Sequence, residues 1–425
     1  MNFDRIRELL WEQTFHSSKL SSVLVMLEEV GKFISGRTPK SDELASIGDI
    51  PYFKVGDMNT EGNEKFLRIT SLFLKEKAGK TFPAGAIVYP KNGGAVFTNK
   101  RRILATESVI DLNTGGFVCG EKLNQAYAYM FFCGLDFRKI SKGTALPTID
   151  QKKLHRTKIP VPSLEEQSSI VTRLEEAFAE IDRAEKAYEE LQTLAGVLRG
   201  QILQEAIQGK LVPQLAEEGV VEHIGAAPEK VPFTIPESWK WTTLNAIGKW
   251  KAGGTPSRSI PEYYGGEIPW LKTGDLTDGL ITSVEEYITR AGVENSSAHI
   301  NPAGAVLIAM YGATIGKLGV LAMPCATNQA CCACAVNEEL VDKWYLFYYL
   351  LSQRTGFLQL GAGGAQPNIS KTKIVNYPIP VPPIKEQSRI VAAIEKLLAF
   401  LIYWHGASQT LGRGFLKDWD RSLNF

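Results

Sequence analysis

The sequence reads IPVPSLEEQSSIV at residues 159–171 and IPVPPIKEQSRIV at residues 379–391. In both stretches the prolines fix an extended entry, because proline lacks a backbone N–H and cannot sit inside a helix. From Leu164 and Ile384 onward, glutamates in the first turn are typical of a helix start. The sequence therefore predicts the same strand-to-helix junction twice, in a chain built from two copies.

A long heptad pattern follows the first junction. Apolar residues recur at alternating spacings of four and three, at Ile170, Leu174, Ala177, Ile181, Ala184, Tyr188, Leu191, Ala195, Leu198 and Ile202. The second copy keeps this register at Ile390, Ile394, Leu397 and Leu401. One interpretation is an amphipathic helix packed on its own domain. The length of the pattern favours the other, a coiled-coil spacer in which the two helices pair antiparallel.

Length and composition bound the class of protein. The chain has 425 residues, 44% hydrophobic and 22% charged, which allows two or three globular units with connectors. It opens with no signal-like segment and contains no apolar run that could span a membrane, so we expect a cytoplasmic protein without a membrane partner. The net charge of +1 decides nothing about nucleic acid, because acidic helices can balance a basic face.

The sequence offers few signs of catalytic or metal chemistry. Cys325, Cys331, Cys332 and Cys334 could suggest a metal site, but they form no C-x-x-C pair and lie among small apolar residues, so we expect free, buried cysteines and no metal. GATIGK at residues 312–317 imitates a phosphate-binding loop but lacks its four-residue gap. Methyltransferase, dinucleotide-binding and H-E-x-x-H signatures are absent, so we expect no catalytic residue.

Four landmarks recur in the same order in both halves. Pro39 and Pro256, Asp57 and Asp275, Gly85 and Gly304, and Pro160 and Pro380 lie 217, 218, 219 and 220 residues apart. A repeat this long indicates a duplicated domain, since solenoid units are roughly 20 to 50 residues long. Between landmarks the loops diverge: YPKNGGAVFTNKRR at residues 89–102 faces AMYGATIGKLG at 309–319. That pattern suits one fold reading two different targets.

The chain resembles the specificity (S) subunits of type I restriction-modification enzymes over essentially its whole length. The resemblance rests on both P-V-P-x-x-x-E-Q junctions with their heptad helices, the G-x-T-P turns at Gly36 and Gly253, the Ile-Pro-aromatic segments at Ile50 and Ile268, and GKLVP at residues 209–213. It implies an α+β fold in which two target recognition domains, each a small bent sheet with helices, are joined by two long antiparallel coiled-coil helices with pseudo-twofold symmetry.

The repeat and the resemblance together predict the domain boundaries. They are an N-terminal helix at 1–20 that completes the second repeat, recognition domain 1 at 21–158, a central spacer helix at 159–211, a linker at 212–236, recognition domain 2 at 237–378 and a C-terminal spacer helix at 379–425. The N-terminal assignment follows because residues 9–20 resemble 202–211, whose counterpart the second copy lacks.

The resemblance also implies a function and partners. Each domain of such a subunit reads one half of an asymmetric bipartite site in double-stranded DNA. The coiled coil sets the gap and docks two methyltransferase (M) subunits, and restriction (R) subunits join through the complex. No cofactor is expected on this chain, because S-adenosylmethionine, ATP and Mg²⁺ belong to the partner subunits. The alternatives are an autonomous DNA-modifying enzyme, which the missing motifs disfavour, and a coiled-coil scaffold, which leaves the loop-rich domains unexplained.

Candidate DNA contacts are polar and basic loop residues, because Lys and Arg contact phosphates while Arg, Lys, Asn and Gln read base edges. In the first domain they are Lys54, Lys91, Asn92, Lys100, Arg101 and Arg102; in the second they are Lys272, Tyr311, Lys317, Gln366, Asn368 and Lys371. Solvated surface is the alternative interpretation for each of them.

Overall fold

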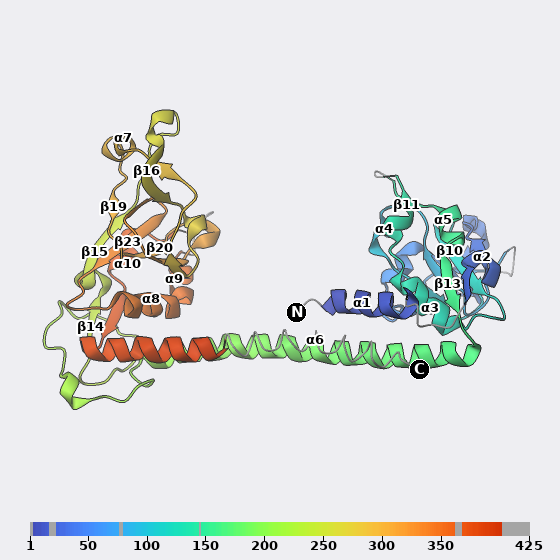
Figure 1. The fold of residues 1–425 in the computed structure, drawn as a ribbon, viewed down its shortest axis with the longest axis horizontal. Coiled ribbons are helices and arrows are strands. Elements are labelled where there is room, and N and C mark those ends of the chain that lie inside the picture. Colours follow the sequence, from blue (N-terminus) through green and yellow to red (C-terminus); the bar gives the residue numbers. More distant parts are fainter. Residues whose placement is uncertain (1–2, 17–22, 76–79, 144–145, 362–367, 402–425) are drawn as a thin grey trace. The chain divides into compact units, whose positions relative to one another are not determined.

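The computed structural model describes residues 3–16, 23–75, 80–143, 146–361 and 368–401 (Figure 1). They form two compact units, and the boundary between Glu189 and Glu190 falls inside the long helix α6 (Leu164–Ile207). Unit 1 holds the described residues up to Glu189, and unit 2 holds those from Glu190 onward. Each unit has its own hydrophobic core.

Unit 1 contains two small sheets of short strands. The five-stranded sheet has the order β2 (Gly31–Ser35), β10 (Thr114–Cys119), β7 (Ile87–Pro90), β8 (Arg102–Leu104) and β5 (Phe66–Leu67). The four-stranded sheet has the order β3 (Leu44–Ala45), β6 (Phe73–Leu74), β4 (Ile50–Phe53) and β9 (Val109–Ile110). The strands are short because Gly, Pro and Asn interrupt every apolar run, as the sequence indicates.

Helices and two small ribbons complete unit 1. The helices are α1 (Phe3–His16), α2 (Leu27–Val30), α3 (Gln125–Gly134), α4 (Phe137–Ile140), α5 (Gln151–His155) and the first half of α6. The ribbons pair β1 (Val23–Met26) with β13 (Lys158–Val161), and β11 (Ser141–Lys142) with β12 (Thr148–Ile149). The 3-10 turns η2 (Val55–Asn59) and η3 (Gly94–Thr98) lie in its loops.

Unit 2 repeats the strand order of the five-stranded sheet of unit 1. Its five-stranded sheet runs β15 (Gly248–Ala252), β23 (Cys331–Val336), β20 (Val306–Ala309), β21 (Leu318–Leu321) and β17 (Gly279–Ile281). Its second sheet runs β18 (Tyr287–Ile288), β16 (Tyr264–Leu271), β22 (Cys325–Thr327) and β19 (Ile300–Asn301), and β14 (Lys240–Thr243) pairs with β24 (Pro378–Val381). The helices are the end of α6, α7 (Arg290–Glu294), α8 (Lys343–Ser352), α9 (Arg354–Gly361), α10 (Lys371–Val375) and residues 384–401. The predicted α+β duplication is confirmed.

The four clustered cysteines lie in the strands of unit 2. Cys325 is in β22, the other three are in β23, and all four are free and buried, as the sequence predicts. Burial raises the pKa of Cys325 and of Cys332 to about 12, so these thiols are neutral and pack as small apolar side chains.

The repeated E-Q motif has the same structural role in both junctions. Gln387 accepts a hydrogen bond from the N–H of Asp342 at 2.8 Å and donates to Leu340 O and Pro382 O, each at 2.9 Å. Gln167 makes the equivalent bonds to Asn124 N, Lys122 O and Pro162 O. Both glutamines are fully buried, and Asp342 and Asn124 are the N-caps of α8 and α3. The motif therefore ties the start of each long helix to its recognition domain.

We predict that Gln387→Ala lowers the free energy of unfolding by about 2–4 kcal/mol, because it removes three buried hydrogen bonds and leaves their backbone partners unsatisfied. Urea unfolding followed by tryptophan fluorescence is the measurement, since Trp239, Trp250 and Trp270 are buried in unit 2. Gln359→Ala on the exposed surface of α9 is the matched control, with an expected change within about 0.5 kcal/mol. Equal effects of the two substitutions contradict this role of Gln387.

The apolar seam of α6 contacts different partners along its length. Ile170, Leu174 and Ile181 are buried in the core of unit 1, so here the helix packs on its own domain, the alternative that the sequence left open. Tyr188 packs edge-to-face on Phe3 of α1, with ring centroids 6.0 Å apart. This part of the seam is therefore covered by unit 1, and its pairing with the second copy stays a prediction.

The remaining seam positions divide into buried and exposed sets. Ile390 and Ile394 are buried in the core of unit 2, where residues 384–401 and the end of α6 share one cluster. Leu191, Leu198 and Leu397 are 46%, 37% and 38% exposed, and Leu401 is half-buried. Residues 402–425 lie outside the described part of the chain, so the pairing of the exposed positions stays a prediction.

Helix α1 packs on the first recognition domain. Trp11 Nε1 donates to Met130 O of α3 at 3.0 Å, and Arg7 forms ion pairs with Asp182 and Glu185 of α6 at 2.7 and 2.5 Å. Leu10 is fully buried, like Leu203, its counterpart at the end of α6 in unit 2. Whether α1 also adjoins the C-terminal segment, as its assignment to the second repeat predicts, falls on undescribed residues.

Candidate nucleic-acid interface

Because of their directions, several strands of each unit begin or end at the same side of the sheets, and the loops that connect them lie together there. We call this side an edge. In unit 1, β7 and β10 are antiparallel with Pro90 opposite Thr114, so the end of β7 and the start of β10 share an edge. β2 ends there with Ser35 opposite Gly115. We call the loops at this edge the recognition edge. It comprises residues 36–39, 54–59, 91–99, 111–113 and 146–150 of unit 1, and residues 253–256, 272–275, 310–317, 328–330 and 368–371 of unit 2.

The two recognition edges have the same backbone frame. A short turn precedes β10 and β23, and its first residue, Asp111 or Asn328, donates its N–H to Phe53 O or Leu271 O at 3.0 or 2.9 Å. The carbonyl of its last residue, Asn113 or Ala330, accepts a hydrogen bond at 2.7 Å from the N–H of the residue after β7 or β20. These donors are Lys91 and Met310. We call residues 111–113 and 328–330 the frame turns.

A glycine explains the repeated G-x-T-P signature beside each frame turn. A Cβ on Gly36 would lie 1.9 Å from Asp111 O, and a Cβ on Gly253 would lie 2.2 Å from Asn328 O. Only glycine allows the chain to pass this close to the turn. The signature is therefore a packing requirement of the recognition edge.

The loops after β7 and β20 are each bridged to a second loop. Asn92 pairs with Thr148 in unit 1, and Tyr311 pairs with Asn368 in unit 2. Candidate residues that are far apart in sequence are thus brought together: Tyr311, which is 38% exposed, lies beside the exposed Asn368. Gln366 lies outside the described residues.

The first-domain candidates differ in how freely their side chains are presented. Lys54 is exposed, whereas Lys91 and Asn92 are half-buried. Partial burial lowers the pKa of Lys91, and the nearby carboxylate of Asp111 opposes that shift. Lys100 donates to Asn59 Oδ1, and Arg102 donates to Met58 O at 2.7 Å, so both side chains also hold η2 in place.

The position of Arg101 corrects its prediction as a DNA contact. It is only 2% exposed, its guanidinium donates to Asn99 O and Leu135 O, and it stacks over the Phe137 ring 3.6 Å from the centroid. Burial lowers its pKa to about 10, so it remains charged at neutral pH. A guanidinium enclosed in this way cannot contact a phosphate, and the predicted contact is contradicted. Its role is to fix the end of the β7–β8 loop against the turn before α4.

We predict that Arg101→Ala lowers the free energy of unfolding by about 3 kcal/mol, because it leaves a cavity and two carbonyls without their donor. Arg156→Ala, at an exposed arginine of the same unit, should change it by less than about 0.5 kcal/mol. Arg101→Ala should also leave the salt dependence of DNA binding unchanged, since each lost phosphate contact reduces its slope by about one. A reduced slope with unchanged stability would restore the original prediction.

The second-domain candidates are mostly exposed. Lys317, Asn368 and Lys371 are exposed, and Lys371 begins α10. Lys272 is half-buried and forms an ion pair with Glu286 at 3.1 Å. Arg258 also pairs with Glu286, and these hydrogen bonds lower the pKa of that carboxyl. A phosphate near Lys272 must therefore compete with Glu286.

Sequence reasoning missed polar residues of the frame turns and of the adjacent G-x-T-P turn. Asn113, Thr255 and Gln329 belong to the recognition edge, and Thr255 Oγ1 donates to Gln329 Oε1. The available signal was the polar residues that end each short apolar stretch, Asp111 and Asn113 in the first half and Asn328 and Gln329 in the second.

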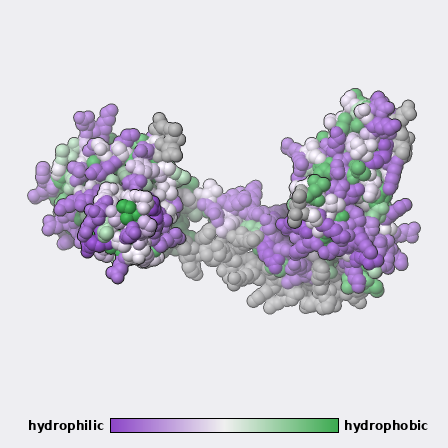
Figure 2. Space-filling model, turned by 90° about the horizontal axis from the view of Figure 1, so that it is seen from above, coloured by the Kyte–Doolittle hydropathy of each residue, from purple (hydrophilic) through white to green (hydrophobic). Residues whose placement is uncertain are grey.

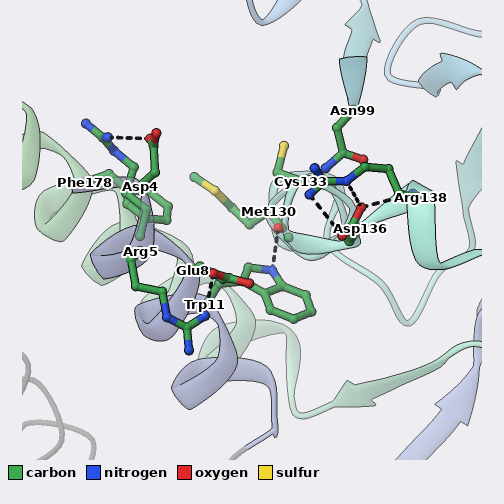
Figure 3. A pocket seen from close by; sticks show the side chains of 12 residues that line it. Asp4, Arg5, Glu8, Trp11, Asn99, Met130, Cys133, Asp136, Arg138 and Phe178 are labelled. Carbon is green, nitrogen blue, oxygen red and sulfur yellow. Dashed lines mark hydrogen bonds and ion pairs between the residues drawn. The ribbon is translucent and has the colours of Figure 1, made fainter. Parts of the chain in front are cut away.

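The rest of the surface offers less specific features. Figure 2 shows hydrophilic side chains over most of the visible surface, with hydrophobic ones in scattered patches. A pocket of about 620 Å³ in unit 1 is lined by α1 and the end of α3. Its arginines are paired, Arg5 with Glu8 at 2.5 Å, Arg138 with Asp136 at 2.8 Å and Arg7 with Asp182 at 2.7 Å, so it concentrates no charge for a ligand (Figure 3). None of the predicted DNA contacts lines it.

The described residues contain neither a group of metal-binding side chains nor a membrane-spanning helix. Within the described ranges, no three His, Cys, Asp or Glu side chains are grouped so that they could hold a metal ion. No helix in the described part of the chain is both long and apolar enough to cross a membrane.

Solved structures share this fold. The chain aligns over 96% of its length with the HsdS subunit of Thermoanaerobacter tengcongensis, covering 98% of that chain at 19% identity and a TM-score of 0.60. It aligns over 95% of its length with 96% of a chain from a study of assembly and conformational transition in a type I R-M system, at 20% identity and a TM-score of 0.63.

Curated specificity subunits are similar to this chain in sequence. The Escherichia coli EcoR124I/EcoR124II specificity subunit is 34% identical over 163 residues, which cover 37% of this chain and 40% of that protein. The Methanocaldococcus jannaschii MjaVIII specificity subunit is 24% identical over 409 residues, 88% of this chain and 85% of that one. The first of these matches thus spans less than half of the relative.

A family model matches each copy of the repeat. The model of the type I restriction modification DNA specificity domain matches residues 22–193 and 236–407. These two segments cover most of the chain and contain both recognition edges. With its duplicated sheets, its paired junctions and these two matches, the chain belongs to the type I restriction modification DNA specificity family.

Proposed function

We propose that this chain is the sequence-specific DNA-binding subunit of a type I restriction-modification complex. Each recognition domain reads one half of an asymmetric bipartite site in double-stranded DNA. One observation carries this proposal: the two recognition edges share their backbone hydrogen bonds but differ in their side chains, Asn92 standing where Tyr311 stands in the second unit. A common frame with different polar surfaces is what two different half-sites require.

We further infer that the long helices set the gap between half-sites and dock two methyltransferase subunits, through which restriction subunits join. The exposed seam residues Leu191 and Leu198 support a helix surface that takes a partner. On this proposal the chain works in the cytoplasm, carries no catalytic residue and holds no cofactor, whereas S-adenosylmethionine, ATP and Mg²⁺ are bound by the partner subunits.

Incubation of the purified chain with DNA, S-adenosylmethionine and Mg²⁺ tests the absence of catalysis. We predict no methylation and no cleavage by the chain alone, and adenine methylation once its methyltransferase subunits are added. The control is the methyltransferase subunits without this chain, which should not modify a specific site. Methylation or cutting by the chain alone would instead support an autonomous DNA-modifying enzyme.

A further inference from the structure

The frame turns hold different residues on the same backbone. Residues 111–113 are Asp-Leu-Asn in unit 1, and residues 328–330 are Asn-Gln-Ala in unit 2. Thr114 N donates to Asp111 O and Cys331 N donates to Asn328 O, each at 3.1 Å. In unit 1 the Asp111 carboxylate also accepts from Asn113 N and Thr114 Oγ1, at 2.8 and 3.0 Å. The side chains of the middle residues take no part in these bonds, so they are not needed to form the turns. Leu112 and Gln329 therefore occupy equivalent apex positions at which the fold tolerates different chemistry.

Both apex side chains face solvent. Leu112 is 55% exposed, although it is a large apolar side chain next to buried strand residues, and Gln329 is also exposed. Thr255 Oγ1 donates to Gln329 Oε1, which fixes the orientation of the amide. The Gln329 amide nitrogen makes no hydrogen bond within the described part of the chain, so both of its N–H groups are available to a ligand. Gln329 is thus an oriented polar group that the fold itself does not use.

A lysine flanks each apex at an equivalent position. Lys54 and Lys272 directly follow Phe53 and Leu271, the residues whose carbonyls accept from the frame turns. Their own N–H groups are bonded to Asp57 and Asp275, at 2.7 and 2.8 Å, so the local geometry is the same in both units. Lys54 is exposed, whereas the Lys272 ammonium pairs with Glu286 at 3.1 Å, so a phosphate there must displace that carboxylate. A lysine next to the apex in the backbone frame suits an interface in which phosphate contacts position the protein and base contacts specify the sequence.

We propose that the apex of each frame turn reads one base pair: Gln329 reads an adenine through its amide, and Leu112 contacts the methyl group of a thymine. The inference rests on the proposed function and assigns base-reading positions within it. A glutamine amide can donate to adenine N7 and accept from N6–H, and the second lone pair of Oε1 remains available beside the Thr255 bond. Leucine has no hydrogen-bonding group, so among major-groove features it matches the thymine methyl.

The test is selection of bound duplexes from a randomised DNA library by the full chain in complex with its methyltransferase subunits. The wild-type complex should prefer adenine at one position of one half-site by roughly 5- to 150-fold, and Gln329→Leu should remove that preference. The other half-site and the gap should stay the same. Gln329→Glu should shift that position toward cytosine, whose N4 amine donates to a carboxylate. Leu112→Gln should change one position of the opposite half-site. Gln201→Leu, an exposed glutamine on α6, is the matched control and should change nothing.

The outcomes separate this inference from the proposed function. Unchanged preferences in Gln329→Leu and Gln329→Glu overturn the inference while leaving the function intact. Loss of every preference in one half-site, with an unchanged melting temperature, also overturns it, because the turn then shapes the whole surface instead of reading one base. If Gln329→Leu fails to fold, Gln329→Glu decides. Failure of the wild-type complex to select any sequence refutes the proposed function itself.

Discussion

Exchange of residues 22–158 for the equivalent domain of another S subunit is expected to replace one half-site completely and leave the other unchanged. The reason is structural: unit 1 has its own core and its own recognition edge, and the Gln167 bonds attach the domain to α6 through main-chain groups. The backbone groups that accept and donate these bonds do not depend on which bases the loops read. Methylome sequencing of cells that carry the hybrid subunit is the measurement.

The control for this exchange is the same hybrid with Gln167→Ala. It should show the new half-site with lower activity, because the domain is then attached less firmly while its loops are unchanged. A hybrid that alters both half-sites, or neither, would show that the two domains do not read independently.

Insertion of four residues into α6 should lengthen the unread gap by one or two base pairs. At about 1.5 Å per residue, the 44-residue helix is roughly 66 Å long, and four residues add about 6 Å and about one helical turn. The insertion is best placed after Gly196, where a side chain would meet no neighbouring atom and the flanking seam is exposed. The rise of DNA is about 3.4 Å per base pair, which gives the expected change. Mapping of methylated sites measures it.

Replacement of Thr193, Leu194 and Gly196 by alanine is the matched control, because it perturbs the same surface at constant helix length. It should leave the gap unchanged. If the insertion variant is active and keeps the original gap, the length of α6 does not set the spacing.

The sequence was sufficient to predict the duplication and the junctions. The repeated PVPxxxEQ segments form the β13–α6 junction and its counterpart after β24, because proline restricts the backbone and the buried glutamine needs three main-chain partners. The seam of α6 was harder to predict. A heptad pattern shows that one face of a helix is buried, but it does not identify what covers that face. Ile170 and Ile181 are covered by the core of unit 1, which includes residues of α1, although the same pattern suits a partner helix.

The recognition edge was predictable only in part. Lys54, Lys317 and Lys371 are exposed at that edge, where basic residues in divergent loops led us to expect them. Arg101 was misjudged because an arginine in a basic run gives no sign of burial, which depends here on Phe137 and on carbonyls distant in sequence. The frame turns were missed because their importance comes from hydrogen bonds between strands that the sequence does not display.

The most direct test of the central claim is a map of adenine methylation in cells that express this chain with its methyltransferase subunits, compared with cells that lack this chain. The proposed function predicts an asymmetric bipartite sequence, two different half-sites separated by a fixed unread gap, that is methylated only when the chain is present. A palindromic or continuous site, or an identical methylation pattern in both strains, would contradict the conclusion that the two recognition edges read two different targets.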